Sequence, residues 1–124
     1  MKELVDFFEE QDDVAIAFLF GSRARGSTDS GDWDLALFFG PQVSSRLERL
    51  ARLERLRSSL AGRVGCSGEL IDLADLERAP IGLCITVAEE GTILKGHGSL
   101  ELFRFYQRAW SAQEEFHFRK AHGL

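Results

Sequence analysis

The chain has 124 residues and a mass of 13.9 kDa, which suits one small domain, and its 44% hydrophobic composition is enough for a single core. Fifteen basic against twenty acidic residues give a formal net charge of -5, which argues against the broad basic surface that general nucleic-acid binding needs. We therefore expect residues 1–124 to form one domain that has no nucleic acid as a direct partner.

The cysteines and the first residues of the chain bear on its location. Cys66 and Cys84 are far apart and show no metal-ligand spacing, so we expect reduced thiols and not a disulfide or zinc framework. Residues 1–13 are charged throughout and contain no apolar core of a signal peptide. No apolar run reaches the length of a membrane span. These features predict a cytoplasmic protein without membrane contact.

Hydrophobic spacing predicts the elements of the first third of the chain. Residues 2–11 carry apolar side chains at helical spacing and predict a short amphipathic helix. Residues 14–20 (VAIAFLF) are continuously apolar and precede a Gly, which is typical of a strand buried on both faces. Residues 21–31 are rich in Gly and Ser and predict a turn. Residues 34–39 then predict a second strand that pairs with the first or lies near it.

The segment that follows predicts the clearest helix, from a cap at Ser44 or Ser45 to Gly62. Its leucines recur at steps of three and four residues, and we expect them in the core: Leu47, Leu50, Leu53, Leu56 and Leu60. Its arginines are expected to form a solvated face, laced by glutamates: Arg46, Arg49, Arg52, Arg55 and Arg57.

The remaining elements are shorter, except the last. Residues 69–73 predict a third strand, residues 75–79 a helical turn ended by a proline, and residues 81–90 a helix ended by a glycine. Residues 92–94 predict a short edge strand. Residues 99–121 predict a helix whose aromatic side chains we expect mainly in the core. Strands alternating with helices indicate an α/β fold.

Two carboxylates stand at the start of the second strand. Asp32 and Asp34 are two residues apart, so in a strand their side chains point to the same face. Two like charges about 4 Å apart repel by roughly 4 kcal/mol at an effective dielectric near 20, so a site that holds them together implies a cation between them. The spacing predicts a divalent-metal site.

Two further features place phosphate chemistry beside this pair. Gly21 and Ser22 follow the buried strand directly and offer backbone amides and a hydroxyl to phosphates. Asp72, on the opposite face of its strand from its apolar neighbours, is the best candidate for a third carboxylate beside a nucleophile. Taken singly, a Gly-Ser turn, an Asp-x-Asp pair and a strand aspartate all have ordinary structural roles. Their joint order indicates phosphoryl or nucleotidyl transfer.

GSRARG followed by DWDLALFF resembles the minimal nucleotidyltransferase (MNT) family of the polymerase-beta superfamily, and the resemblance extends through IDLADLERAP and EEGTIL. It implies the nucleotidyltransferase fold, a small mixed sheet of three to four strands flanked by helices. It also implies site roles. Asp32, Asp34 and Asp72 are the implied catalytic residues and ligands of two Mg²⁺ ions, and the implied nucleotide contacts are Gly21, Ser22 and, in a second tier, Arg25.

The chain departs from the usual family pattern at two positions. Gly31 stands where Ser is common before the first metal-binding Asp, and Trp33 replaces an aliphatic residue. The spacer of nine residues between Ser22 and Asp32 is at the short end. Neither change removes an implied ligand, so the catalytic set is complete.

Family members of this size resemble antitoxins of HEPN/MNT toxin–antitoxin pairs. This implies a protein that transfers AMP from ATP to a tyrosine of a HEPN toxin and so inactivates it, in a hetero-oligomer with that toxin. Two alternatives stay open. The chain is a binding module that neutralises the toxin by contact, which its aromatic last helix motivates, or it transfers a nucleotide to a small molecule such as an aminoglycoside.

Overall fold

A computed structural model describes residues 1–26 and 31–123. The elements, in chain order, are α1 (Lys2–Glu9), β1 (Val14–Phe20), α2 (Gly21–Ala24), β2 (Trp33–Phe39), α3 (Arg46–Val64), the 3-10 helix η1 (Gly68–Leu70), β3 (Ile71–Asp75), α4 (Ile81–Glu90), β4 (Thr92–Lys95) and α5 (Leu100–Ala121). Four strands form one mixed sheet in the order β3-β2-β1-β4. β1 pairs antiparallel with β2 and β4, whereas β2 and β3 are parallel. The predicted α/β fold, with a small mixed sheet flanked by helices, is confirmed.

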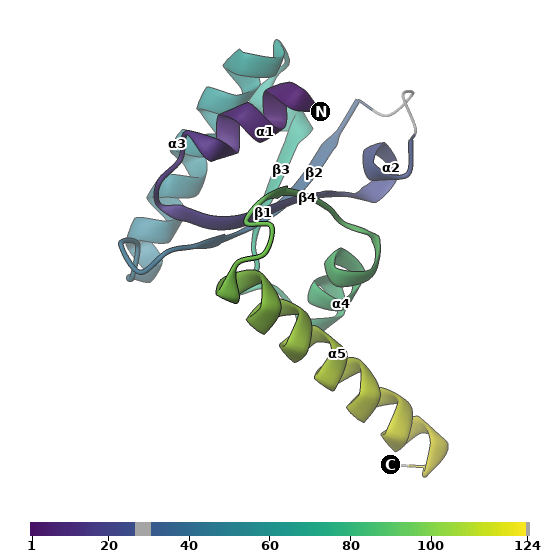
Figure 1. The fold of residues 1–124 in the computed structure, drawn as a ribbon. Helices are drawn as coiled ribbons and strands as arrows, with labels where there is room; N and C mark the ends of the chain where they lie inside the picture. Colours follow the sequence, from purple (N-terminus) through teal and green to yellow (C-terminus); the bar gives the residue numbers. More distant parts are fainter. Residues whose placement is uncertain (27–30, 124) are drawn as a thin grey trace.

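The sheet is covered on both faces, as the apolar run of β1 predicts. Ala17 and Leu19 join a core cluster with side chains of α1 and α3, while Ile16 and Phe18 join a second cluster with side chains of α4 and α5. Figure 1 shows α1 and α3 on one side of the strands and α4 and α5 on the other. Because side chains alternate between faces along a strand, β1 contributes to both clusters and is the centre of the core.

The boundaries of several elements differ from those expected. The third strand begins at Ile71, because residues 68–70 form η1, whose start is capped by the Ser67 hydroxyl. Residues 76–78 form a turn and not a helical turn, and the Asp75 carboxylate accepts a hydrogen bond from the amide of Glu77. The predicted turn after β1 begins with the four-residue helix α2.

The leucines of α3 do not form the single core stripe that we expected. Leu56 and Leu60 are buried, but Leu47 is 77% exposed and Leu50 is 52% exposed. A helix has 3.6 residues per turn, so each step of three residues falls about 60° short of a full turn. Three such steps place Leu47 on the opposite side of α3 from Leu56. The expectation was wrong for the first two leucines for this reason.

The arginines of α3 are likewise not all on a solvated face. Arg49 is buried; its Nε lies 3.1 Å from an Asp75 carboxylate oxygen, and its guanidinium donates to the Ser44 carbonyl at 2.9 Å. Arg52 is mostly buried and pairs with Asp13. The same helical period that places Leu47 on the exposed side of α3 places Arg49 and Arg52 on its buried side.

The last helix is core only along one stripe. Leu102, Phe105 and Ala109 are buried, and Phe105 lies 5.3 Å from Phe18 between ring centroids. Four other aromatic side chains are 49–63% exposed, contrary to the expectation of a mainly buried stripe: Phe103, Trp110, Phe116 and Phe118. Figure 1 shows that the second half of α5, which carries Phe116 and Phe118, extends away from the sheet. None of the helices in the described ranges is both long and apolar enough to cross a bilayer.

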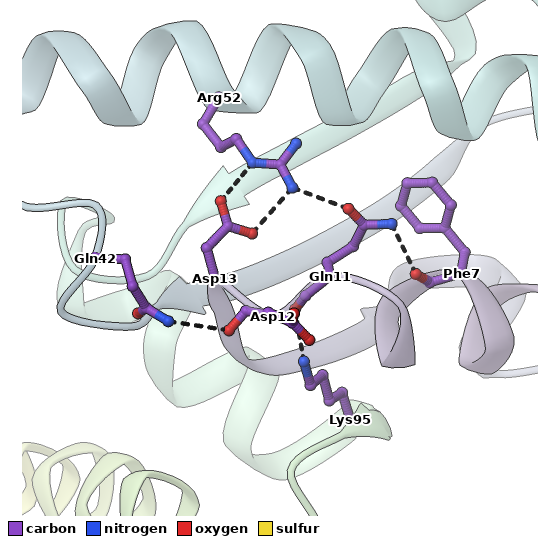
Figure 2. Close-up of polar contacts among 7 residues, drawn as sticks. All are labelled: Phe7, Gln11, Asp12, Asp13, Gln42, Arg52 and Lys95. Atoms are coloured by element: carbon purple, nitrogen blue, oxygen red, sulfur yellow. Dashed lines mark hydrogen bonds and ion pairs between the residues drawn. The ribbon is translucent and has the colours of Figure 1, made fainter.

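A polar network fixes the segment between α1 and β1 (Figure 2). The Arg52 guanidinium binds both oxygens of the Asp13 carboxylate and donates to the Gln11 side chain at 2.9 Å. The Gln11 amide donates to the Phe7 carbonyl at 3.0 Å, and Lys95 of β4 donates to the Gln11 carbonyl at 2.6 Å. Side chains from α3 and β4 thus hold the chain where it enters the central strand.

We expect Asp13→Asn to lower the free energy of unfolding by about 1–2 kcal/mol, because a charge-assisted pair with both side chains about 80% buried is lost. The hydrogen bond from Arg52 lowers the pKa of Asp13 below its ordinary 3.8. A lowered native pKa stabilises the fold above the unfolded-state pKa and ceases to do so as the pH falls through the native pKa. Urea unfolding from pH 7 to pH 2 should therefore show the variant and wild type converging in acid.

Asp12→Asn is the matched control, because Asp12 is exposed and its backbone carbonyl, not its carboxylate, accepts the hydrogen bond from Gln42. It should leave the free energy of unfolding unchanged at every pH. An equal loss in both variants would contradict a specific role for the pair between Asp13 and Arg52.

Candidate active site

Two of the three predicted carboxylates are direct neighbours across the sheet. Asp34 of β2 is the register partner of Asp72 of β3, and on its other side Asp34 is the partner of Phe20 of β1. Paired residues of adjacent strands point to the same face, about 5 Å apart. The parallel pairing of β2 and β3 places both carboxylates near the starts of their strands. Asp32 precedes Asp34 by two residues, just before β2 begins.

The backbone of Gly21 lies directly against the Asp34 carboxylate. Gly21 ends the extended path of β1 and has φ +73°, a conformation that favours glycine. A Cβ at this position would overlap Oδ2 of Asp34, well inside van der Waals contact. The sequence therefore needs Gly here for two reasons, the left-handed backbone and the closeness of the carboxylate. Ser22 follows in α2, whose first backbone N–H groups have no partner within the helix.

The charges around Asp34 disfavour its ionised form. Burial raises the pKa of Asp34, and the negative charges of Asp72 and Asp32 raise it further, whereas the charge of Arg25 lowers it. The negative charges of two neighbouring carboxylates therefore act on Asp34, and the charge of Arg25 opposes them. Such an arrangement costs folding free energy at neutral pH unless a cation binds there.

An arginine that sequence reasoning passed over closes the turn. The Arg23 guanidinium donates from Nε to the Asp32 carbonyl at 2.8 Å and lies over the Trp33 ring, 3.7 Å from its centroid. This contact gives a physical reason for an aromatic residue at position 33. The sequence could have predicted this contact from an Arg in the turn and a Trp at the start of the next strand, because Arg stacks well on indole.

Arg25 has a different position from Arg23. Its side chain is 58% exposed and pairs with Glu90 at the end of α4, with 3.3 Å between Nη1 and Oε1. It is also near enough to Asp34 to lower the pKa of that carboxyl. Arg25 therefore lies between the carboxylates and α4. Its contact with a phosphate stays a prediction.

A pocket of about 360 Å³ opens beside the carboxylates, and Asp32, Asp34 and Asp72 all line it. In residues 1–26 and 31–123, no three His, Cys, Asp or Glu side chains form a group that would hold a metal ion by themselves. Mg²⁺ commonly takes only one or two protein carboxylates and fills its remaining positions with substrate phosphates and water. The three aspartates fit a Mg²⁺ ion that takes some of its ligands from the protein and the others from a nucleotide and water. They do not fit a site in which the protein supplies every ligand.

Residues 2–98 match the sequence profile of the family described as polymerase beta, nucleotidyltransferase. The chain belongs to this family. The match covers the sheet, the Gly21 turn and all three aspartates of this nucleotidyltransferase, and it ends before α5. No curated protein matches the chain.

Solved structures similar to this nucleotidyltransferase come from toxin–antitoxin complexes. A toxin–antitoxin complex with AMP-PNP contains a chain with a TM-score of 0.72 and 22% identity, covering 97% of this chain and 92% of that chain. A chain of the MntA–HepT toxin–antitoxin complex has a TM-score of 0.66 and 20% identity, and the match covers 97% of this chain and 90% of that chain. The complex of a tri-AMPylated Shewanella oneidensis HEPN toxin with MNT antitoxin contains a chain with a TM-score of 0.63 and 21% identity. That match covers 97% of this chain and 89% of that chain. At these identities the likeness establishes the fold.

Proposed function

We propose that this chain is a Mg²⁺-dependent adenylyltransferase that moves AMP from ATP to a tyrosine of a HEPN-family toxin and so inactivates it. The observation that carries the proposal is the pairing of Asp34 with Asp72 against the backbone of Gly21, which places two carboxylates beside the start of a Gly-Ser turn. The solved complexes support the nucleotide and the partner, since one of the similar structures is described with AMP-PNP and another with a tri-AMPylated HEPN toxin.

In the proposed reaction, the acceptor oxygen forms a bond to the α-phosphorus of ATP while the bond to the β-phosphate oxygen breaks, and pyrophosphate leaves. Asp72 lies beside the acceptor and takes the hydroxyl proton, directly or through water. Gly21 and Ser22 bind the leaving phosphates through backbone amides and the hydroxyl, and Arg25 is a second contact for them. Asp32 and Asp34, with Asp72, would hold Mg²⁺ together with the nucleotide phosphates, and the ion would neutralise the triphosphate charge.

The decisive experiment mixes the purified chain with Mg-ATP and the helical protein encoded by the neighbouring gene. Intact-mass spectrometry should show that this protein gains AMP, and peptide mapping should place the AMP on tyrosine. Adding EDTA should prevent the gain. A partner whose mass does not change under these conditions would count against the proposal, as would AMP that is found only on a small molecule such as an aminoglycoside.

A second candidate function, neutralisation by contact alone, is supported by the exposed aromatic side chains of α5. Four aromatic side chains there are about half exposed or more, which is uncommon for a surface that faces water alone: Phe103, Trp110, Phe116 and Phe118. Aromatic side chains are enriched in the cores of protein interfaces. The partner that fits these exposed side chains is the same toxin, so contact and AMP transfer can occur in one complex.

We expect the double variant Phe116→Ser/Phe118→Ser to weaken toxin binding about tenfold or more, because exposed aromatic side chains dominate interface energies. Its free energy of unfolding should change by no more than about 0.5 kcal/mol, since both side chains are exposed. Calorimetric titration with the toxin measures the first effect. Gln107→Ser, at another exposed position on α5, is the control and should bind like wild type.

A further inference from the structure

A groove leads away from the carboxylates on the side of β3, and no role has so far been given to it. The pocket lined by Asp72 adjoins a second one of about 300 Å³, and the two share Arg57, Gly68 and Glu69. The second pocket continues along α3 past Glu54 and Ser58. Together these two pockets, which we call the α3–η1 groove, connect the site to the outer surface.

The order of strands decides what this groove can bind. Gly21 stands at the end of β1, Asp34 on β2 and Asp72 on β3, so the three lie in a row across the sheet. Figure 1 shows α2 and α3 on opposite sides of β2. In phosphoryl transfer, the attacking and leaving oxygens are roughly in line through the phosphorus. If the leaving phosphates are on the Gly21 side, the attacking hydroxyl comes from the α3–η1 side.

The charge of the α3–η1 groove indicates what surrounds that hydroxyl. Arg57 is its one cation among the described lining residues, and Nη1 of Arg57 is already 2.7 Å from a Glu54 carboxylate oxygen. Glu69 is exposed and takes part in no ion pair among the residues that the structure describes. Of the acidic side chains described in this lining, it alone has neither a proposed metal role nor an arginine partner. A basic side chain of the acceptor would provide an ion-pair partner for the Glu69 carboxylate.

We infer that the α3–η1 groove binds the acceptor polypeptide, and that Glu69 pairs with a basic side chain next to the acceptor hydroxyl. This inference rests on the proposed function. Glu69 is a specificity residue here, because it recognises the acceptor without touching the reacting atoms. Residues of α3 and η1 line the groove, which is present in the structure without an acceptor.

The test is steady-state kinetics of toxin AMPylation by Glu69→Lys, with Asp12→Lys as the control of equal charge change. Asp12 is exposed and lies beside Gln42, at the opposite end of β2 from Asp34. We expect Glu69→Lys to raise the KM for toxin about five- to tenfold and to leave kcat and the KM for ATP within about twofold. The difference in the KM for toxin between Glu69→Lys and wild type should become smaller at high salt, since exposed charges are screened. Glu69→Gln should give a smaller increase, and the control none.

The outcomes separate the two proposals. If wild type transfers no AMP to the toxin, both fail. If wild type transfers AMP and Glu69→Lys matches it in the KM for toxin, only the groove inference is overturned. A rise confined to the KM for ATP would overturn it as well and would assign the groove to the nucleotide. Thermal unfolding of each variant should match wild type, because the Glu69 side chain is exposed.

Discussion

Asp34→Asn is expected to lower the rate of AMP transfer about 100- to 1000-fold while leaving the metal-free fold as stable as wild type or more stable. A bound metal ion provides several kcal/mol of transition-state stabilisation, and each 1.4 kcal/mol corresponds to about a tenfold change in rate. Burial and the charges of Asp72 and Asp32 raise the pKa of Asp34, so its ionised form is disfavoured in the fold. Removing that charge removes the repulsion.

Single-turnover transfer and urea unfolding in EDTA measure the two effects separately. Asp32→Asn should lower the rate of transfer in the same way, and Asp6→Asn on the exposed face of α1 is the control that should change neither quantity. A large loss of metal-free stability in Asp34→Asn would mean that this carboxylate has a structural partner and would contradict a metal site. If both variants lose transfer but still neutralise the toxin, contact alone suffices for neutralisation.

Gly21→Ala is expected to cost both stability and activity. At φ +73° an alanine is strained by about 1–2 kcal/mol. Its Cβ would also overlap Oδ2 of Asp34, so the carboxylate must move. Displacement of a reacting group by about 1 Å costs about a hundredfold in rate, and we expect at least this loss in AMP transfer.

Gly65→Ala is a closely matched control. Gly65 follows the end of α3 with φ +74°, and a Cβ added there would meet no atom within 4 Å beyond its chain neighbours. This variant should lose a similar free energy of unfolding through backbone strain and keep full activity. Equal losses of activity in the two variants would show that backbone strain, and not the closeness of Asp34, accounts for the effect of Gly21→Ala.

Local patterns predicted most of the helices and strands, though not all of their bounds, and they named the candidate site residues. The apolar run of β1 predicts a strand buried on both faces, and residues of β1 do enter both core clusters. Ser45 caps α3 as expected, through its hydroxyl and the amide of Glu48. The motif order predicts Asp34 and Asp72 on neighbouring strands, and their register pairing agrees with it. Their roles in metal binding and catalysis stay predictions.

Helix faces were less predictable, because a step of three residues does not match the period of an α-helix. The leucine spacing of α3 reads as one stripe, yet it winds around the helix and leaves Leu47 in solvent. Arg49 and Arg52 lie on the same side of α3 as the buried Leu56, where they pair with Asp75 and Asp13. Likewise, the spacing of α5 does not reveal that its second half has no sheet beneath it.

The sequence by itself determined the carboxylates, the glycine turn and the alternation of strands and helices, because each of these follows from short-range spacing. The tertiary structure alone decided that the Gly21 backbone abuts Asp34 and that a groove leaves the site beside Glu69. These features depend on contacts between strands and helices that only the folded chain brings together, so no local pattern encodes them.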